Sequence, residues 1–183
     1  MQTIETRLSD QFIRITTKVP PTHVDDRMQT GTTATLTLDA AAIEKELRAC
    51  IKGEVRFGDG DRGMYASDAG NYRMVPIGVV LPKDAEDVMH LLAVCRRHGA
   101  PIVARGGGTG IPGQTVNVAV LLDFSKYMNG IVEMNPAQNY ARVQPGIVLD
   151  ELRKAAGKHG LTFGPDPATH SRNTLGGMIG NNS

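Results

Sequence analysis

The sequence has few of the residues that mark several common classes of protein. It contains no tryptophan, 4% aromatic residues and only two cysteines, Cys50 and Cys95, among 183 residues. Two isolated cysteines form neither a disulfide framework nor the repeated spacing of a metal site, so we expect reduced thiols and no bound metal. The formal net charge of +1 provides no basic surface for nucleic acid.

Long hydrophobic runs are missing as well. No stretch approaches the roughly 20 consecutive apolar residues of a membrane span, and the N-terminus lacks the pattern of a signal peptide. We therefore expect a cytoplasmic protein with no membrane span and no nucleic-acid partner. The length suffices for one ordinary domain or for two small subdomains.

Glycine, in contrast, is abundant, at 21 of 183 residues, or about 11% against roughly 7% in an average protein. Its densest cluster follows the apolar run Ile102–Ala104 and Arg105, and consists of Gly106, Gly107, Gly108, Gly110 and Gly113. Successive backbone N–H groups in such a loop can form a concave anion site, most often for phosphate. Arg105 would add a guanidinium suited to phosphate. The alternative is a glycine-rich surface turn between two strands.

Residues Gly108–Gly113 also spell G-x-G-x-x-G, the fingerprint of Rossmann dinucleotide-binding folds. That motif requires a helix that begins at its end and an acidic residue about 20 positions further on. Here the β-branched alternation in Val116–Asp123 predicts a strand instead, and Asp123 comes too soon. We reject the Rossmann interpretation and expect any dinucleotide to bind between strands, through backbone amides.

Hydrophobic periodicity predicts a mixed α and β chain. Helices are expected near 39–51, 83–98 and 148–158, and strands near 75–80, 101–104, 116–123, 131–134 and 140–144. Residues 55–74 are predicted to be loop, with Asp59–Asp61 in a turn rather than a calcium site. Residues 1–38 are polar without sustained periodicity and predict an arm that is loose or lies on another part of the molecule.

A second glycine-rich passage occupies residues 164–183. Gly176 and Gly177 would allow close approach of a ligand, while Thr174 and Asn181–Ser183 supply neutral donors and acceptors. A tight surface turn is the alternative, but beside the first loop the passage is better interpreted as the other wall of one ligand site. The chain ends inside this passage, which we take as a sign of a fragment.

Five motifs in this order resemble the FAD-linked oxidases that share the vanillyl-alcohol-oxidase or PCMH-type flavin domain. They are Val80–Pro82, Arg105–Gly110, Val143–Gly146, Gly164–Pro167 and Gly176–Asn182. The likeness is closest to the FAD and iron–sulfur dehydrogenases of D-2-hydroxy acids, and it covers roughly residues 65–183.

This resemblance implies an α+β fold of two subdomains that hold extended FAD between them. It implies a complete first α/β subdomain over 65–125 and a truncated second subdomain over 126–183, whereas the N-terminal arm and helix over residues 1–64 are expected from the sequence pattern alone. The implied cofactor-binding residues are Arg105, Gly106, Gly107, Gly108, Thr109, Gly110, Gly113, Gln114, Pro165, Asp166, Thr174, Gly176 and Gly177. Thr109 stands where some relatives carry a histidine bonded to the flavin, so non-covalent FAD is expected.

The resemblance also implies an activity: oxidation of a D-2-hydroxy acid, of the D-lactate or D-2-hydroxyglutarate type, by hydride transfer to FAD. The family's catalytic residues, substrate-binding groups and iron–sulfur cysteines lie downstream, so we name no catalytic residue and no electron acceptor. The chain alone is expected to be inactive and to bind FAD weakly or not at all, with an apolar face that a homodimer could cover. The alternative function is a nucleotide- or phosphate-binding module without redox chemistry.

Overall fold

The structure, a computed structural model, describes residues 5–8, 11–14 and 38–183, in two separate units, 1–36 and 37–183. In the first unit, β1 (Glu5–Leu8) and β2 (Gln11–Arg14) pair antiparallel. The expected arm, loose or lying on another part of the molecule, stays a prediction, although these eight residues form local strand pairs within it. The remainder of that predicted arm, up to residue 37, lies outside the described residues.

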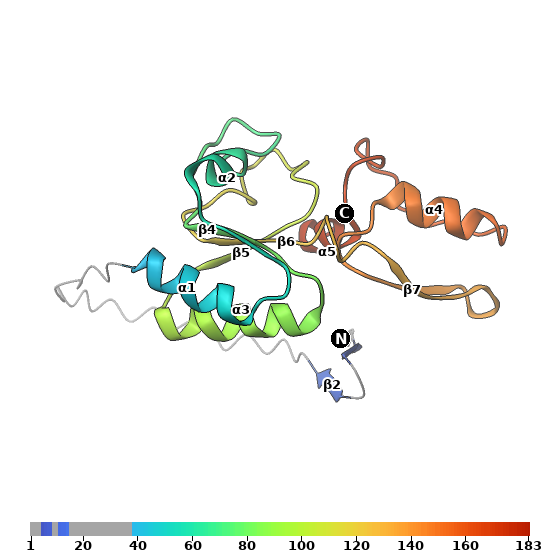
Figure 1. Ribbon diagram of the computed structural model, residues 1–183. Helices are drawn as coiled ribbons and strands as arrows, with labels where there is room; N and C mark the ends of the chain where they lie inside the picture. The colour runs from blue at the N-terminus through green and yellow to red at the C-terminus, as the bar shows by residue number, and fades with distance from the viewer. Residues whose placement is uncertain (1–4, 9–10, 15–37) are drawn as a thin grey trace, which may run out of the picture. The chain divides into compact units, whose positions relative to one another are not determined.

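The second unit contains a four-stranded sheet in the order β3-β4-β6-β5 (Figure 1). Its strands are β3 (Glu54–Arg56), β4 (Gly78–Leu81), β5 (Ile102–Arg105) and β6 (Val120–Asp123). β4, β6 and β5 run parallel, while β3 is antiparallel to β4 at one edge. The strand predicted over 116–123 begins only at Val120, since the preceding residues belong to the loop that returns from β5.

Two helices cover one face of this sheet, α1 (Ala40–Cys50) and α3 (Ala85–His98) (Figure 1). Both start at an aspartate N-cap: Asp39 accepts a hydrogen bond from the Ala42 amide, and Asp84 from the Asp87 amide. Apolar residues at helical spacing then meet every second residue of the strands. The core on this face includes Ile43, Leu47, Val80, Leu91, Val94, Cys95, Val120 and Leu122.

The alternate strand residues face the other side of the sheet. Val79, Leu81 and Leu121 form a smaller core there, with Tyr65 and Tyr127 packed against it. α2 (Asp59–Met64) lies within the segment that was predicted to be loop. It contacts β4. That prediction was wrong at β3 and α2, and Asp59–Asp61 forms the first turn of a helix, where acidic residues are favoured.

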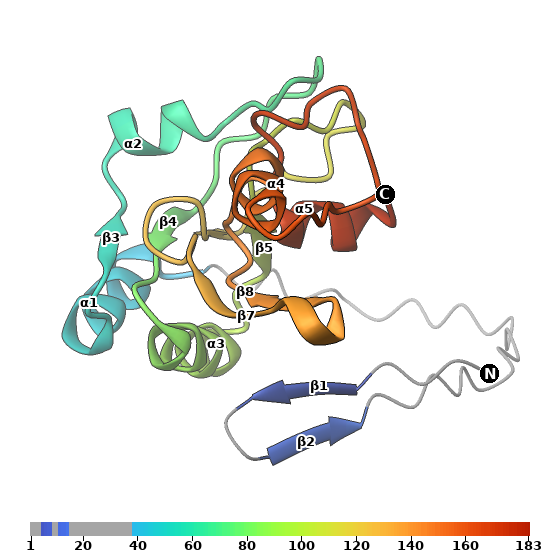
Figure 2. The ribbon, with the colours of Figure 1, turned by 90° about the vertical axis from the view of Figure 1, so that its right-hand side faces the viewer.

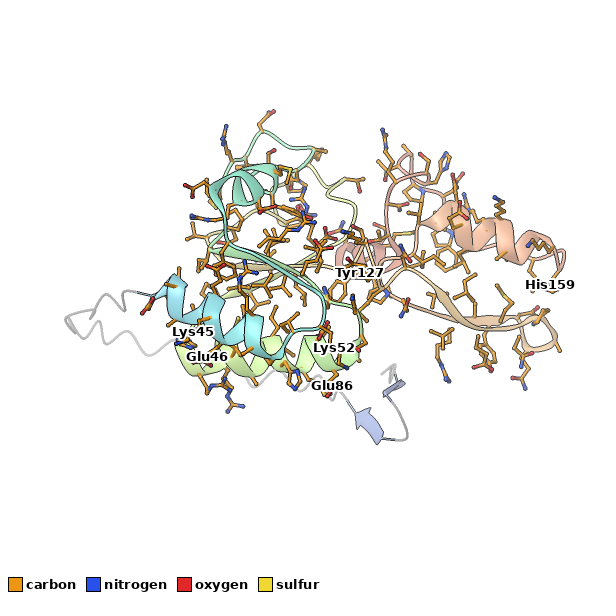
Figure 3. All side chains as sticks on the ribbon, viewed as in Figure 1. Lys45, Glu46, Lys52, Glu86, Tyr127 and His159 are labelled. Carbon is orange, nitrogen blue, oxygen red and sulfur yellow. The ribbon has the colours of Figure 1, made fainter. Side chains whose placement is uncertain are left out.

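The turn between α1 and β3 is fastened to the start of α3. The buried carboxylate of Asp87 accepts hydrogen bonds from the backbone amides of Lys52 (2.8 Å), Gly53 (3.0 Å) and Lys83 (2.9 Å). The Lys52 ammonium lies 2.5 Å from Glu86 and 3.0 Å from Asp84 (Figure 3). These carboxylates raise the pKa of Lys52, Glu86 foremost.

The carboxylate of Glu54, at the edge of the sheet, links β3 to the segment that follows β6. Glu54 accepts hydrogen bonds from Lys126, Tyr127 and Arg56. These donors, Lys126 first, lower the pKa of Glu54 to about 2. Glu54 therefore stays ionised throughout the physiological range.

The rest of the unit consists of a hairpin and two helices around a second core. β7 (Ile131–Asn135) and β8 (Tyr140–Val143) are joined through a 3₁₀ turn, Pro136–Gln138. α4 (Leu149–Gly157) and α5 (Leu175–Asn181) lie beside this hairpin (Figure 2). Ile147, Leu149, Leu152, Leu175 and Met178 form the buried core. The predicted hairpin and α4 are confirmed, whereas α5 was not predicted. The division into subdomains at residues 64 and 125 stays a prediction.

Candidate functional site

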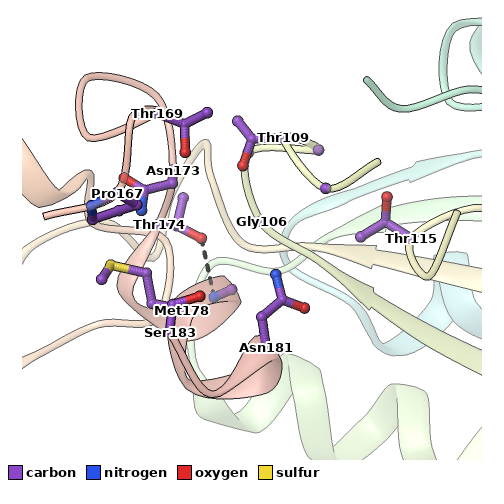
Figure 4. Close-up of a pocket in the computed structure, with 14 residues that line it drawn as sticks. Gly106, Thr109, Thr115, Pro167, Thr169, Asn173, Thr174, Met178, Asn181 and Ser183 are labelled. Carbon is purple, nitrogen blue, oxygen red and sulfur yellow. Dashed lines mark hydrogen bonds between the residues drawn. The ribbon is translucent and has the colours of Figure 1, made fainter. Parts of the chain in front are cut away.

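The predicted glycine loop and the second glycine-rich passage face each other across a cavity of about 130 Å³ (Figure 4). The loop leaves the end of β5, and the opposite wall is formed by the residues that lead into α5. None of the residues that line the cavity carries a charge. They are Gly106–Gly110, Thr115, Pro167, Thr169, Asn173, Thr174, Gly177, Met178, Asn181 and Ser183.

Close packing between the two walls accounts for the first glycines of the loop. A Cβ atom on Gly106 would lie 2.0 Å from Oγ1 of Thr174, and one on Gly107 would lie 2.2 Å from the carbonyl oxygen of Arg172. Gly108 has a φ of +61°, a conformation that favours glycine. The sequence therefore needs glycine here to form the site, whether or not a ligand is bound.

The backbone N–H groups of the loop are the feature that points to a ligand. Within the described residues, none of the five N–H groups from Gly106 to Gly110 donates to a protein acceptor. The Gly108 carbonyl, in contrast, accepts a 3.0 Å hydrogen bond from the Ala69 amide. Unpaired successive amides beside a concave surface suit the diphosphate of a dinucleotide, so the residues present fit FAD.

The opposite wall is held in place by hydrogen bonds to the second core. The Leu175 amide donates to Ile147 (3.0 Å) and the Gly176 amide to Pro145 (2.8 Å). The Thr174 hydroxyl, which is buried, accepts from the Gly177 amide at 3.3 Å and caps α5 (dashed line in Figure 4). This wall is therefore a capped helix start rather than the tight turn that the sequence left open.

Of two asparagines in the site, Asn181 was expected as a neutral donor and acceptor, whereas Asn173 was not predicted. Asn173 is buried, and with its side-chain amide assigned so that the nitrogen faces them, it donates to the carbonyls of His170 and Thr169, both at 3.2 Å. Asn181 accepts a 2.9 Å hydrogen bond from Gln114, which joins the two walls directly. Asn173 directly precedes Thr174, the N-cap of α5, and no local signal in the sequence identified its partners.

A second cavity, of about 400 Å³, shares Gly106, Thr115, Thr174, Gly177 and Asn181 with the first. Three further predicted residues, Arg105, Gln114 and Gly176, line it. The Arg105 guanidinium lies over the Tyr65 ring, and its Nη2 donates to the Ser67 carbonyl at 2.9 Å. Its Nη1 is buried without a partner among the described residues. An unpartnered cationic donor here is a second feature that fits an anionic ligand.

The remaining predicted residues lie away from the first cavity. Gly113, with a φ of +80°, packs against the Tyr72 ring. Asp166 pairs with Arg153 at 2.7 Å, which lowers the pKa of that carboxyl. The Pro165 carbonyl accepts from the same guanidinium at 3.0 Å. The structure thus uses Pro165 and Asp166 to fix the entry of the wall, and their contact with FAD stays a prediction.

Among the described residues there is no group of three or more histidine, cysteine or acidic side chains that could hold a metal ion. None of the helices described is long and apolar enough to cross a membrane.

Comparison with known proteins gives matches over most of the second unit, residues 37–183. Residues 76–183 match the family described as "FAD binding domain". The chain is 37% identical over 132 residues to D-2-hydroxyglutarate dehydrogenase of Pseudomonas putida KT2440, covering 70% of this chain and 13% of the relative. It is 34% identical over 143 residues to glycolate oxidase subunit GlcD of Bacillus subtilis 168, covering 76% of this chain and 30% of the relative. The chain therefore spans a minor part of the length of both relatives.

The fold recurs in a crystal structure of alkyldihydroxyacetonephosphate synthase. The match has a TM-score of 0.68 at 24% identity and covers 76% of this chain and 28% of that one. At this identity the likeness concerns the fold alone. Together with the family match it confirms the predicted mixed α and β architecture of an FAD-binding domain.

Proposed function

Because the chain belongs to the FAD-binding-domain family, we propose that it is the cofactor-binding part of a flavin-dependent oxidoreductase that oxidises a D-2-hydroxy acid. The single observation that carries the proposal is the row of five amides, Gly106–Gly110, which line the cavity and donate to no acceptor among the described residues. The matched relatives, a D-2-hydroxyglutarate dehydrogenase and a glycolate oxidase subunit, support 2-hydroxy acids as the substrate class.

In this proposal the residues of the chain bind and orient the cofactor. The loop amides hold the diphosphate, where their fixed dipoles stabilise negative charge. Thr174, Asn173 and Asn181 supply neutral hydrogen-bonding groups along the opposite wall. The bound flavin would accept a hydride from the substrate's α-carbon. No residue of the described part is assigned to the substrate.

The proposal also covers how the flavin is attached and where in the cell the protein is located. Thr109 lines the cavity, and its hydroxyl is no counterpart to the histidine of covalent flavoproteins, so the flavin is held without a bond. A cytoplasmic location is proposed because the two cysteines are free thiols. We assign no described residue to an iron–sulfur cluster or to the electron acceptor, and a homodimer that covers an apolar face of the chain stays a prediction.

The test is the absorption spectrum of the protein purified from its native host, recorded before and after anaerobic addition of D-2-hydroxy acids. We expect flavin bands that D-2-hydroxyglutarate, D-lactate or glycolate bleaches, and complete release of the flavin on acid denaturation. A colourless protein that FAD does not reconstitute would favour the phosphate-binding module. Flavin bands that no 2-hydroxy acid bleaches would contradict the substrate class.

A further inference from the structure

The segment from Tyr65 to Tyr72 lies against the glycine loop. Its Ala69 amide donates to the Gly108 carbonyl at 3.0 Å. Further along, a Cβ atom on Gly70 would lie 2.2 Å from the Ile111 carbonyl oxygen, so the two backbones are in direct contact. The 65–72 segment therefore follows the loop over several residues rather than touching it once.

The side chain of Arg105 fills the space between this segment and the loop. Its guanidinium carbon is 5.4 Å from the centroid of the Tyr65 ring. The Tyr65 hydroxyl in turn donates to Asp123 at 2.8 Å, at the end of the neighbouring strand β6. A cation held over an aromatic ring that is itself hydrogen-bonded has little freedom to move.

Asp68 connects the segment to the far end of the loop. Its Oδ2 accepts a 3.0 Å hydrogen bond from the Thr115 hydroxyl, and its Oδ1 accepts a 2.8 Å hydrogen bond from the Gly70 amide. The segment itself is closed by a 2.9 Å hydrogen bond from Met74 to Ala66 and a bridge between Ser67 and Arg73. Asp68 thus fixes Thr115 to an element that is already closed on itself.

A loop with five glycines loses more backbone entropy on ordering than an ordinary loop. If the loop became ordered only when the ligand binds, this entropy cost would weaken the affinity. Contacts that order the loop in the free protein avoid that cost at the binding step. We infer that Asp68 is a positioning residue: through Thr115 and the 65–72 segment it holds the glycine loop in the conformation whose amides receive the diphosphate. The ligand in this inference rests on the proposed function, whereas the ordering of the loop does not.

The experiment compares Asp68→Ala and Asp68→Asn with Asp59→Ala in the 183-residue chain. Asp59 lies nine positions upstream, fully exposed and paired only with Arg62 at the surface, so it controls for loss of a carboxylate. Nitrogen-15 relaxation gives order parameters for the amides of Gly106–Gly110, and FAD titration gives Kd. Asparagine keeps one acceptor for the Gly70 amide and tests the inference if the alanine variant does not fold.

In Asp68→Ala we expect the loop order parameters to fall from about 0.85 towards 0.6 or below, and Kd to rise about tenfold. Asp68→Asn should give a smaller change in the same direction, and Asp59→Ala none. Adding Thr115→Val to Asp68→Ala should change the order parameters little further, because the same contact is already lost.

A lowered Tm with unchanged loop order parameters would show that Asp68 is merely structural and would overturn the inference. Equal loop order in the wild type and both Asp68 variants would overturn it too. If the wild-type chain binds no FAD, the titration speaks against the proposed function alone. The relaxation data then still decide the inference about Asp68.

Discussion

Replacing Gly107 with alanine is expected to weaken FAD binding by about 10- to 100-fold, equivalent to about 1.4 to 2.7 kcal/mol. The added Cβ would lie 2.2 Å from the Arg172 carbonyl oxygen, closer than such atoms approach. One wall of the cavity must therefore move, and the loop amides lose their alignment. The free energy of unfolding should fall by about 1 to 3 kcal/mol, the usual effect of overpacking. Fluorescence titration with FAD and chemical denaturation measure the two effects.

Gly164→Ala is the matched control, because a Cβ at Gly164 has no atom within 4 Å and Gly164 lies outside the cavity lining. We expect its unfolding free energy to stay within about 0.5 kcal/mol of the wild type, with unchanged FAD affinity. If Gly107→Ala binds FAD as tightly as this control, the close contact between the two walls does not shape the site.

Removing the buried carboxylate of Asp87 should have the largest effect on stability. Asp87→Ala leaves three amide donors, those of Lys52, Gly53 and Lys83, without their acceptor. A hydrogen bond to a charged group contributes about 1.5 to 3 kcal/mol, and contributions that share one acceptor do not add fully. We expect the free energy of unfolding to fall by at least about 3 kcal/mol, measured by urea denaturation.

Asp39→Ala gives the scale for this prediction, since Asp39 is also an aspartate that accepts from a backbone amide, but at an exposed helix start. Loss of an exposed cap costs about 1 kcal/mol. If the two substitutions lowered the free energy of unfolding equally, neither the burial of Asp87 nor its three amide donors would contribute extra stability.

The parts of the fold that the sequence predicted are those governed by local pattern. α3 is preceded by the N-cap Asp84 and followed by the C-cap Gly99, which has a φ of +63° as expected for a glycine cap. β4 and β5 follow from short apolar runs between turn residues. The absence of a helix after Gly113 also follows from the β-branched alternation, and the structure confirms it.

α5 shows why local pattern was insufficient elsewhere. Its sequence contains Gly176, Gly177 and Gly180, each of which disfavours a helix by about 1 kcal/mol relative to alanine. The helix forms because Thr174 caps it and because Leu175 and Met178 are buried in the second core. These are tertiary effects that override propensity, and no property of the passage itself reveals them.

The glycine loop was predicted correctly as a wall of a cavity, but its surroundings were not. Its neighbours, Asp68, Asn173 and Asn181, lie 37 to 73 positions away from the nearer end of Arg105–Gly108 in the chain, so their contacts depend on the assembled fold. Arg105 illustrates the difference: the sequence suggested a phosphate contact, whereas the guanidinium is found between Tyr65 and Gly108. Its contact with a phosphate stays a prediction.

The central claim is that FAD lies between the glycine loop and the start of α5. A titration of the nitrogen-15-labelled chain with FAD, followed by amide chemical shifts, tests it most directly and detects weak binding. We expect the largest shifts at Gly106–Gly110 and Thr174–Gly177, with none near Lys154 and Lys158 at the C-terminal end of α4. Saturable shifts confined to residues outside the two walls would contradict the account.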